Sequence, residues 1–226
     1  MQHFTYLLIN FFTIIICFVY SFDRRIQFHK HFITFLKSSI IVAIPFIIWD
    51  IYFTKTGVWW FNADYLIGLT LVNLPIEEIL FFICIPFSCV FTYFCLSKFF
   101  DLNWANAFNS IIVFISLISC AVIGLLHLDK IYTCSTAFLT VFTLIYMFFI
   151  RQKKWIGEVS FVYSLLMLGF FPVNGILTGT GLEKPIVNYN PHDFLGIRIL
   201  TIPIEDAVYG YNLFIWNLYF FKKWRK

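Results

Sequence analysis

Charged residues are scarce in this chain of 226 residues, of which only 12% are charged and 61% are hydrophobic. An ordinary soluble domain has about twice that charged share, so the composition argues against a soluble domain. Motifs for metal, phosphate or dinucleotide binding and the nucleophile elbow of hydrolases are also missing. The six cysteines are scattered through apolar runs without a paired spacing. We therefore predict no metal site.

Long apolar runs dominate the sequence instead. A hydrocarbon core ~30 Å thick takes roughly 20 apolar residues to cross as a helix. Seven runs of about this length are present, at residues 4–22, 32–53, 74–96, 107–126, 131–150, 159–177 and 199–221. Backbone groups in lipid must be hydrogen-bonded within their own segment. We therefore predict an all-α integral membrane protein with seven transmembrane helices.

Basic residues predict the orientation of these helices. Twelve of the 16 Lys and Arg lie in or beside the loops after the first, third and fifth runs and in the C-terminal tail. Lys and Arg of short loops stay in the cytoplasm. This predicts a multi-pass protein of the cell (plasma) membrane, with its N-terminus outside and its C-terminus in the cytoplasm. Topology and anionic lipid explain the net charge of +4, so no nucleic-acid partner is expected.

A shift of 128 residues lays the second half of the sequence over the first. Residues 74–78 (LPIEE) fall on residues 202–206 (IPIED), and Phe81 falls on Tyr209. The same shift aligns the first three apolar runs with the last three. We predict two parallel three-helix repeats. Their expected bounds are residues 1–100 and 131–226, with a connector helix within residues 101–130.

Two acidic pairs are the strongest candidates for chemistry, because ionisable groups within membrane runs are costly and mark functional sites by default. Glu77 and Glu78 follow one proline closely, and Glu205 and Asp206 follow another. Proline suits a helix start or a kink. A simpler interpretation is that these acids complement a helix dipole. It accounts less well for a pattern repeated in both halves, so all four are predicted catalytic residues.

Aromatic residues lie one helical turn after three of these acids, at Phe81, Phe82 and Tyr209. A carboxyl group among rings loses hydration, which favours its neutral, proton-donating form, and rings stabilise a nearby cation. Arg198 of the second unit corresponds to Thr70 of the first, and its charge could keep the second pair ionised. Our hypothesis is that the first pair supplies the acid and the second pair the base or a charge stabiliser.

Other polar residues are weaker candidates. Asp50, after Trp49, is either a site residue or an interfacial anchor. Asn174 either lines a cavity or forms a hydrogen bond between helices. Trp59 and Tyr189 lie in loops where an interfacial aromatic belt is expected. The predicted substrate-binding residues are Phe81, Phe82, Tyr209, Asn174, Arg198 and Asp50.

Together these residues resemble the integral-membrane lycopene cyclase family, here as a fused two-unit chain, and the resemblance covers nearly the whole sequence. Its first-unit pattern is Trp49 and Asp50, Gly68, residues 75–78 (PIEE), Phe81 and Phe82. Its second-unit pattern is residues 172–175 (PVNG), Tyr189 and Asn190, residues 196–198 (GIR), residues 203–206 (PIED) and Tyr209. Ordered matches in both halves are specific, whereas one short motif would not be.

The resemblance implies an enzyme, an intramolecular lyase or isomerase that converts lycopene through γ-carotene to β-carotene. Protonation of a terminal double bond makes a tertiary carbocation, the inner double bond attacks it, and loss of a ring proton restores neutrality. Substrate and product are isomers, so no cofactor is implied. An acid, a base, cation-tolerant walls and exclusion of water are required. The implied partners are lycopene or a related acyclic carotenoid, membrane lipid and other carotenoid enzymes.

Two rival classes differ from this enzyme in their required features. A small-solute or proton-coupled transporter of the three-plus-one-plus-three type would line both leaflets with polar groups, but the cytoplasmic halves of the runs are nearly pure Phe, Ile, Leu and Val. A retinal-type photoreceptor needs a lysine deep in a helix, whereas Lys222 and Lys223 lie at the cytoplasmic tail.

Overall fold

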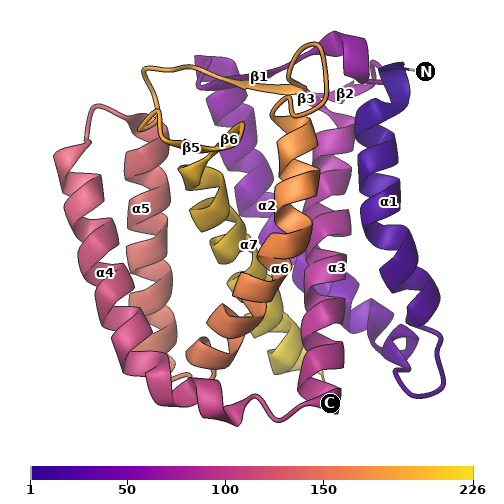
Figure 1. The fold of residues 1–226 in the computed structure, drawn as a ribbon, viewed down its shortest axis with the longest axis vertical. Helices are drawn as coiled ribbons and strands as arrows, with labels where there is room; N and C mark the ends of the chain where they lie inside the picture. Colours follow the sequence, from indigo (N-terminus) through magenta and orange to yellow (C-terminus); the bar gives the residue numbers. More distant parts are fainter. Residues whose placement is uncertain (1, 226) are drawn as a thin grey trace.

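Helices make up most of the computed structural model, which describes residues 2–225. Seven α-helices lie in this part of the chain: α1 (Thr5–Tyr20), α2 (Phe32–Thr56), α3 (Ile76–Phe99), α4 (Asn109–Leu126), α5 (Ile131–Leu144), α6 (Ile156–Leu177) and α7 (Ile204–Trp224). Figure 1 shows them running between two ends of the molecule. Among the described residues, six helical segments are long and apolar enough to cross a membrane: residues 2–20, 28–56, 76–99, 103–126, 131–150 and 156–177. They contain α1 to α6 with the short helices that adjoin them, whereas the more polar α7 is not among them.

Short elements extend or connect these helices. The 3-10 helices are η1 (Gln2–Phe4), η2 (Phe28–His31), η3 (Ala63–Tyr65) and η4 (Asn103–Phe108), and the π-helix η5 (Ile145–Ile150) continues α5. The structure also has six short strands. They gather at one end of the molecule (Figure 1), which we call the strand end, and we call the opposite end the tail end. These strands qualify the all-α prediction.

The strands form three antiparallel pairs. They are β1 (Trp59–Phe61) with β4 (Val187–Tyr189), β2 (Thr70–Leu71) with β3 (Leu74–Pro75), and β5 (Arg198–Ile199) with β6 (Ile202–Pro203). The first pair joins the loop before α3 to the loop before α7, with Trp59 opposite Tyr189. The other two pairs are hairpins that lead directly into α3 and α7. Both loops are thereby fixed over the same end of the helices.

The predicted starts of the third and seventh helices, at residues 74 and 199, were wrong because hairpins occupy those positions. Pro75 and Pro203 precede α3 and α7 in extended backbone, with φ and ψ of −59° and 145° and of −55° and 139°. Proline fixes φ and has no amide hydrogen, which suits the position just before a helix. The hairpins match in detail, since Val72 and Leu200 both have positive φ, at 61° and 58°.

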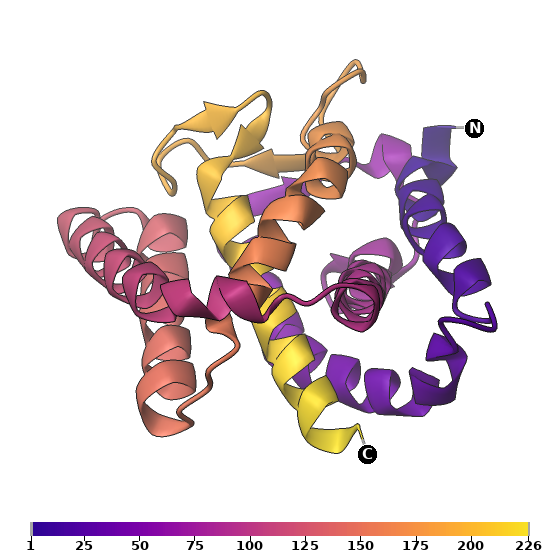
Figure 2. The same ribbon diagram turned by 60° about the horizontal axis from the view of Figure 1, so that its bottom comes forward.

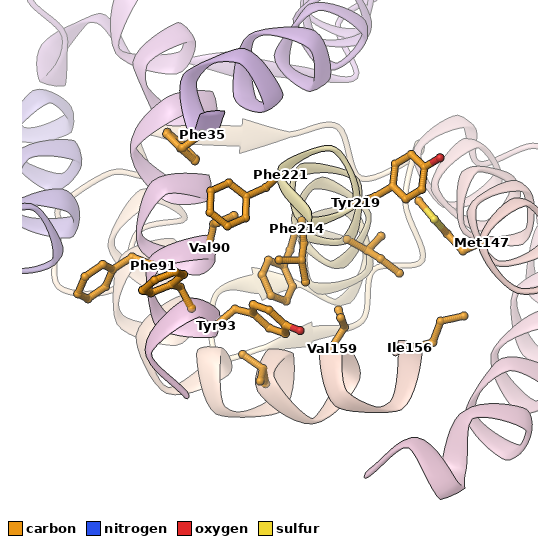
Figure 3. Packing of buried hydrophobic residues seen from close by; sticks show 14 of the residues in the cluster. Phe35, Val90, Phe91, Tyr93, Met147, Ile156, Val159, Phe214, Tyr219 and Phe221 are labelled. Atoms are coloured by element: carbon orange, nitrogen blue, oxygen red, sulfur yellow. The ribbon is translucent and has the colours of Figure 1, made fainter. Parts of the chain in front are cut away.

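Helix α3 lies at the centre of the bundle and contacts α1, α2, α6 and α7. Helices α4 and α5 pack on each other at one edge, with α1 at the opposite edge (Figures 1 and 2). Buried side chains of α2, α3, α6 and α7 fill the tail half of the bundle, and Figure 3 shows Phe35, Val90, Val159, Phe214 and Phe221 among them. The helices therefore form a packed core at the tail half.

Candidate active site

A cavity of about 430 Å³ lies among α1, α2, α3, α5, α6 and α7, with strands β1 and β4 also lining it. Its walls are mainly aromatic rings and aliphatic side chains, as ligand sites commonly are. The ionisable acids that line it are Asp50, Glu78 and Asp206. These belong to three different helices, so the fold brings acids from both halves of the sequence to one cavity.

The first acidic cluster is built around Glu78, in the first turn of α3. Its Oε2 accepts a hydrogen bond from the Tyr6 hydroxyl of α1 at 2.5 Å. The buried Asp50 of α2 lines the same cavity as Glu78, and the Tyr209 hydroxyl of α7 donates to Asp50 Oδ1 at 3.1 Å. Two buried carboxyl groups that line the same cavity disfavour double ionisation. The cluster can therefore hold a proton between them.

The second acidic cluster is built around Asp206, in the first turn of α7. Asp206 Oδ1 accepts from the Tyr132 hydroxyl at 2.7 Å, and Oδ2 accepts from the Tyr189 hydroxyl at 2.8 Å and from Asn174 Nδ2 at 3.1 Å. Tyr189 lies outside the helices, and burial together with the Asp206 charge raises the pKa of its phenol well above the ordinary 10.0. It therefore remains a donor. Three donors on one carboxyl group suit the ionised form.

Glu77 and Glu205 are buried but do not line the cavity. Glu77 Oε1 accepts the backbone N–H of Ile67 at 2.7 Å, and Glu205 Oε1 accepts that of Leu195 at 2.8 Å. The Thr133 hydroxyl also donates to Glu205 at 2.6 Å. These two acids therefore tie the preceding loops to the helix starts. Because neighbouring positions on a helix point in different directions, only the second acid of each pair reaches the cavity.

Aromatic and polar residues predicted to bind substrate are divided between the cavity and its surroundings. Phe81, Tyr209 and Asn174 line the cavity, and the Phe81 and Tyr6 ring centroids lie 6.5 Å apart in an edge-to-face arrangement. Phe82 is fully buried outside it, 6.2 Å from the Phe46 ring. Tyr209 contacts Asp50 through its hydroxyl rather than Glu205.

Arg198 does not line the cavity either. It lies in β5 rather than in the helix, with its guanidinium 4.8 Å from the Phe194 ring centroid and 5.6 Å from that of Tyr189. Within residues 2–225 it has no salt bridge to Glu205 or Asp206. The Tyr189 ring beneath this guanidinium carries the hydroxyl that donates to Asp206.

Tyr6 and Tyr132 are site residues that the sequence analysis missed. They lie on the first helix of each half and donate to Glu78 and Asp206 respectively. Their spacing of 126 residues, close to the 128-residue shift of the repeat, was a signal that could have found them. Trp59 and Tyr189, for which the sequence suggested an interfacial belt, line the cavity.

Comparisons with known proteins point to one family. The family model described as lycopene cyclase matches residues 3–96 and 129–224. The bifunctional lycopene cyclase/phytoene synthase of Arthroderma gypseum is 31% identical over 77 residues, which are 34% of this chain and 12% of that relative. The protein of the same name from Podospora anserina is 32% identical over 71 residues, 30% of this chain and 12% of that relative. The matched segments are thus a small part of these relatives. No solved structure matches.

Proposed function

Because the chain belongs to the lycopene cyclase family, we propose that it is a lycopene β-cyclase that converts lycopene through γ-carotene to β-carotene. Membership of this family supports an enzyme of carotenoid cyclisation and does not favour a transporter. The observation that carries the proposal is the pair of acidic clusters, one suited to hold a proton and one suited to accept it, which face one apolar cavity. Cyclisation needs both a proton donor and a proton acceptor.

The proposed acid is Glu78, which shares its proton with Asp50. Transfer of that proton to a terminal double bond leaves a tertiary cation on the substrate, and the inner double bond attacks it to form the ring bond. Phe81 and Tyr209 line the same space, and their rings can stabilise the cation through their quadrupoles. The apolar walls exclude water, which would otherwise convert the cation to an alcohol.

The proposed base is Asp206, which removes a proton from the new ring. One proton is added and one is lost, so the product is an isomer and no oxidant or cofactor is consumed. Donation by Tyr132, Tyr189 and Asn174 keeps the carboxylate oriented and ionised until it reacts. Return of the proton to Glu78 would complete the cycle.

We further propose that the chain consists of two parallel three-helix repeats, residues 1–100 and 131–226, with a connector within residues 101–130. The matched hairpins support it, as do the equivalent bonds from Ile67 to Glu77 and from Leu195 to Glu205. The family model also leaves residues 97–128 unmatched between its two segments. Parallel repeats bring both acidic pairs to one end, where the second acid of each pair, Glu78 or Asp206, lines one cavity.

Expression in a lycopene-accumulating bacterial strain tests this function. The wild-type chain should convert lycopene to γ-carotene and β-carotene, identified by chromatography of the extracted pigments. Glu78→Gln is the matched control, since it removes only the proton donor. Unchanged lycopene, with the wild-type protein demonstrated in the membrane fraction, would contradict the proposed activity. Release of γ-carotene alone would restrict the activity to one end of the substrate.

A further inference from the structure

Two residues of the cavity wall are also exposed on the molecular surface. Leu165 and Gly169 both line the cavity, yet both are exposed, whereas the other lining residues are buried or half-buried. They lie one turn apart on the same face of α6. Leu168, between them in sequence, is 78% exposed and does not line the cavity. The cavity wall therefore reaches the outer surface of the bundle along this face of α6.

Gly169 has no packing contact that requires glycine. A Cβ built at this position would meet no atom within 4 Å, whereas one at Gly157 on the same helix would lie 2.1 Å from the Ala105 carbonyl oxygen. Glycine in a helix interior is destabilising relative to alanine. No close neighbour of Gly169 requires glycine at this position. A larger side chain here would therefore fill the open space beside the helix.

The position of Gly169 relative to the acids fits an opening for a long apolar molecule. Asn174, which donates to Asp206, lies five residues further along α6, or about 8 Å at the helical rise. An acyclic carotenoid is much longer than this distance. When its end group lies between Glu78 and Asp206, much of its chain must extend beyond Gly169. The exposed hydrophobic side chains around the bundle, Leu168 among them, indicate that lipid lies outside.

We infer that Gly169 is the threshold of a lateral opening through which one end of the substrate enters from the bilayer. Its missing side chain leaves room for the polyene, so Gly169 is a specificity-determining residue for long linear substrates. This inference rests on the proposed function for the identity of the ligand. Gly169 takes no part in the chemistry and affects only the entry of the substrate into the cavity.

Substitution of Gly169 by phenylalanine tests the opening. In proteoliposomes supplied with lycopene, Gly169→Phe should raise the apparent KM at least about tenfold, the scale of a steric mismatch in an apolar pocket, with a smaller effect on kcat. Leu168→Phe is the matched control, because the same ring is added one residue away on the exposed side. Gly169→Ala adds only a methyl group, which meets nothing within 4 Å, and should therefore raise the apparent KM less than Gly169→Phe does.

A binding measurement separates this inference from the proposed activity. Lycopene entering the cavity should quench tryptophan fluorescence, to which Trp59 in the wall contributes. Slower quenching by Gly169→Phe than by Leu168→Phe, at equal thermal stability, supports the opening even if no cyclised product forms, and that lack of product would count against the proposed function alone. Wild-type quenching and KM in Gly169→Phe, or equal loss in both variants, would overturn the inference.

Discussion

Neighbouring acids of the same pair have different surroundings in the site. Glu78 and Asp206 face the cavity, whereas Glu77 and Glu205 accept backbone N–H groups of the preceding loops. We predict that Glu78→Gln and Asp206→Asn each lower kcat by about 10²- to 10⁴-fold, the usual contribution of a general acid or base. Glu77→Gln and Glu205→Gln keep a carbonyl oxygen for the loop and should lose far less. Pigment turnover at equal protein level measures all four.

One result would contradict the assignment of Glu78, rather than Glu77, as the reacting acid. If Glu77→Gln is as inactive as Glu78→Gln while its thermal unfolding midpoint matches the wild type, the first acid of the pair takes part in the chemistry. The isosteric Gln and Asn variants keep side-chain volume. A loss of activity therefore reports on the proton rather than on packing.

Tyr189 gives a pH-dependent prediction. Its raised pKa keeps the phenol protonated, and its hydroxyl donates to Asp206 Oδ2 at 2.8 Å. Hydrogen bonds to a carboxylate favour its charged form, so Tyr189→Phe should make Asp206 easier to protonate. We expect the acid limb of the pH–activity profile to move to higher pH, with the rate on the plateau less affected. Thr180→Val, outside the cavity, is a control, and an unmoved limb would exclude Asp206 as the titrating base.

At the residue scale, the sequence indicated the candidate acids more readily than it indicated the side chains that donate hydrogen bonds to them. Proline, two acids and an aromatic residue form a local pattern that can be seen without a fold. The tyrosines that donate to these acids come from helices about 70 residues away, at Tyr6 for Glu78 and Tyr132 for Asp206. No local pattern specifies such a contact, because it depends on how the helices pack.

Helix α6 is fixed at its tail end by a close approach to η4. A Cβ at Gly157 would lie 2.1 Å from the Ala105 carbonyl oxygen, and the Gly157 N–H donates to Asn109 Oδ1 at 2.5 Å. Gly157→Ala should therefore lower the free energy of unfolding by about 1–3 kcal/mol, as overpacking does. Gly169→Ala on the same helix should be neutral or stabilising. Thermal unfolding in detergent compares them, and equal midpoints would contradict the close approach.

Element boundaries were predicted well where an apolar run and a helix coincide, and poorly at the hairpins. Residues 74–75 and 199–203 are mostly apolar, so they extended the predicted helices. The turns contain Val72 and Leu200 at positive φ, a conformation that such residues adopt rarely. Their side chains therefore gave no turn signal. Gly68 and Gly196, at φ of 86° and 79°, were part of the repeated pattern and do fit turns.

The whole molecule separates its charges along the helix axes. At the tail end, Lys98 Nζ donates to the Ile26 carbonyl at 3.0 Å, and Arg151 and Lys153 lie over the Tyr219 ring at 5.9 and 5.6 Å. The loop after α1 thus meets the end of α3, and the loop after α5 meets the end of α7. Most Lys and Arg of the chain belong to these segments. Their clustering at one end is the physical basis of the predicted orientation.

This charge distribution predicts on which side of the membrane each loop lies. Since Lys and Arg in short loops remain in the cytoplasm, a fluorescent protein fused after Lys226 should fluoresce in bacterial cells. Alkaline phosphatase, which is active only outside the cytoplasm, should be active when fused after Lys130 and inactive when fused after Lys154. These two fusion points lie at opposite ends of α5 and its extension η5, so they differ by one crossing. The reverse pattern would place the strand end, and with it both acidic clusters, on the cytoplasmic side.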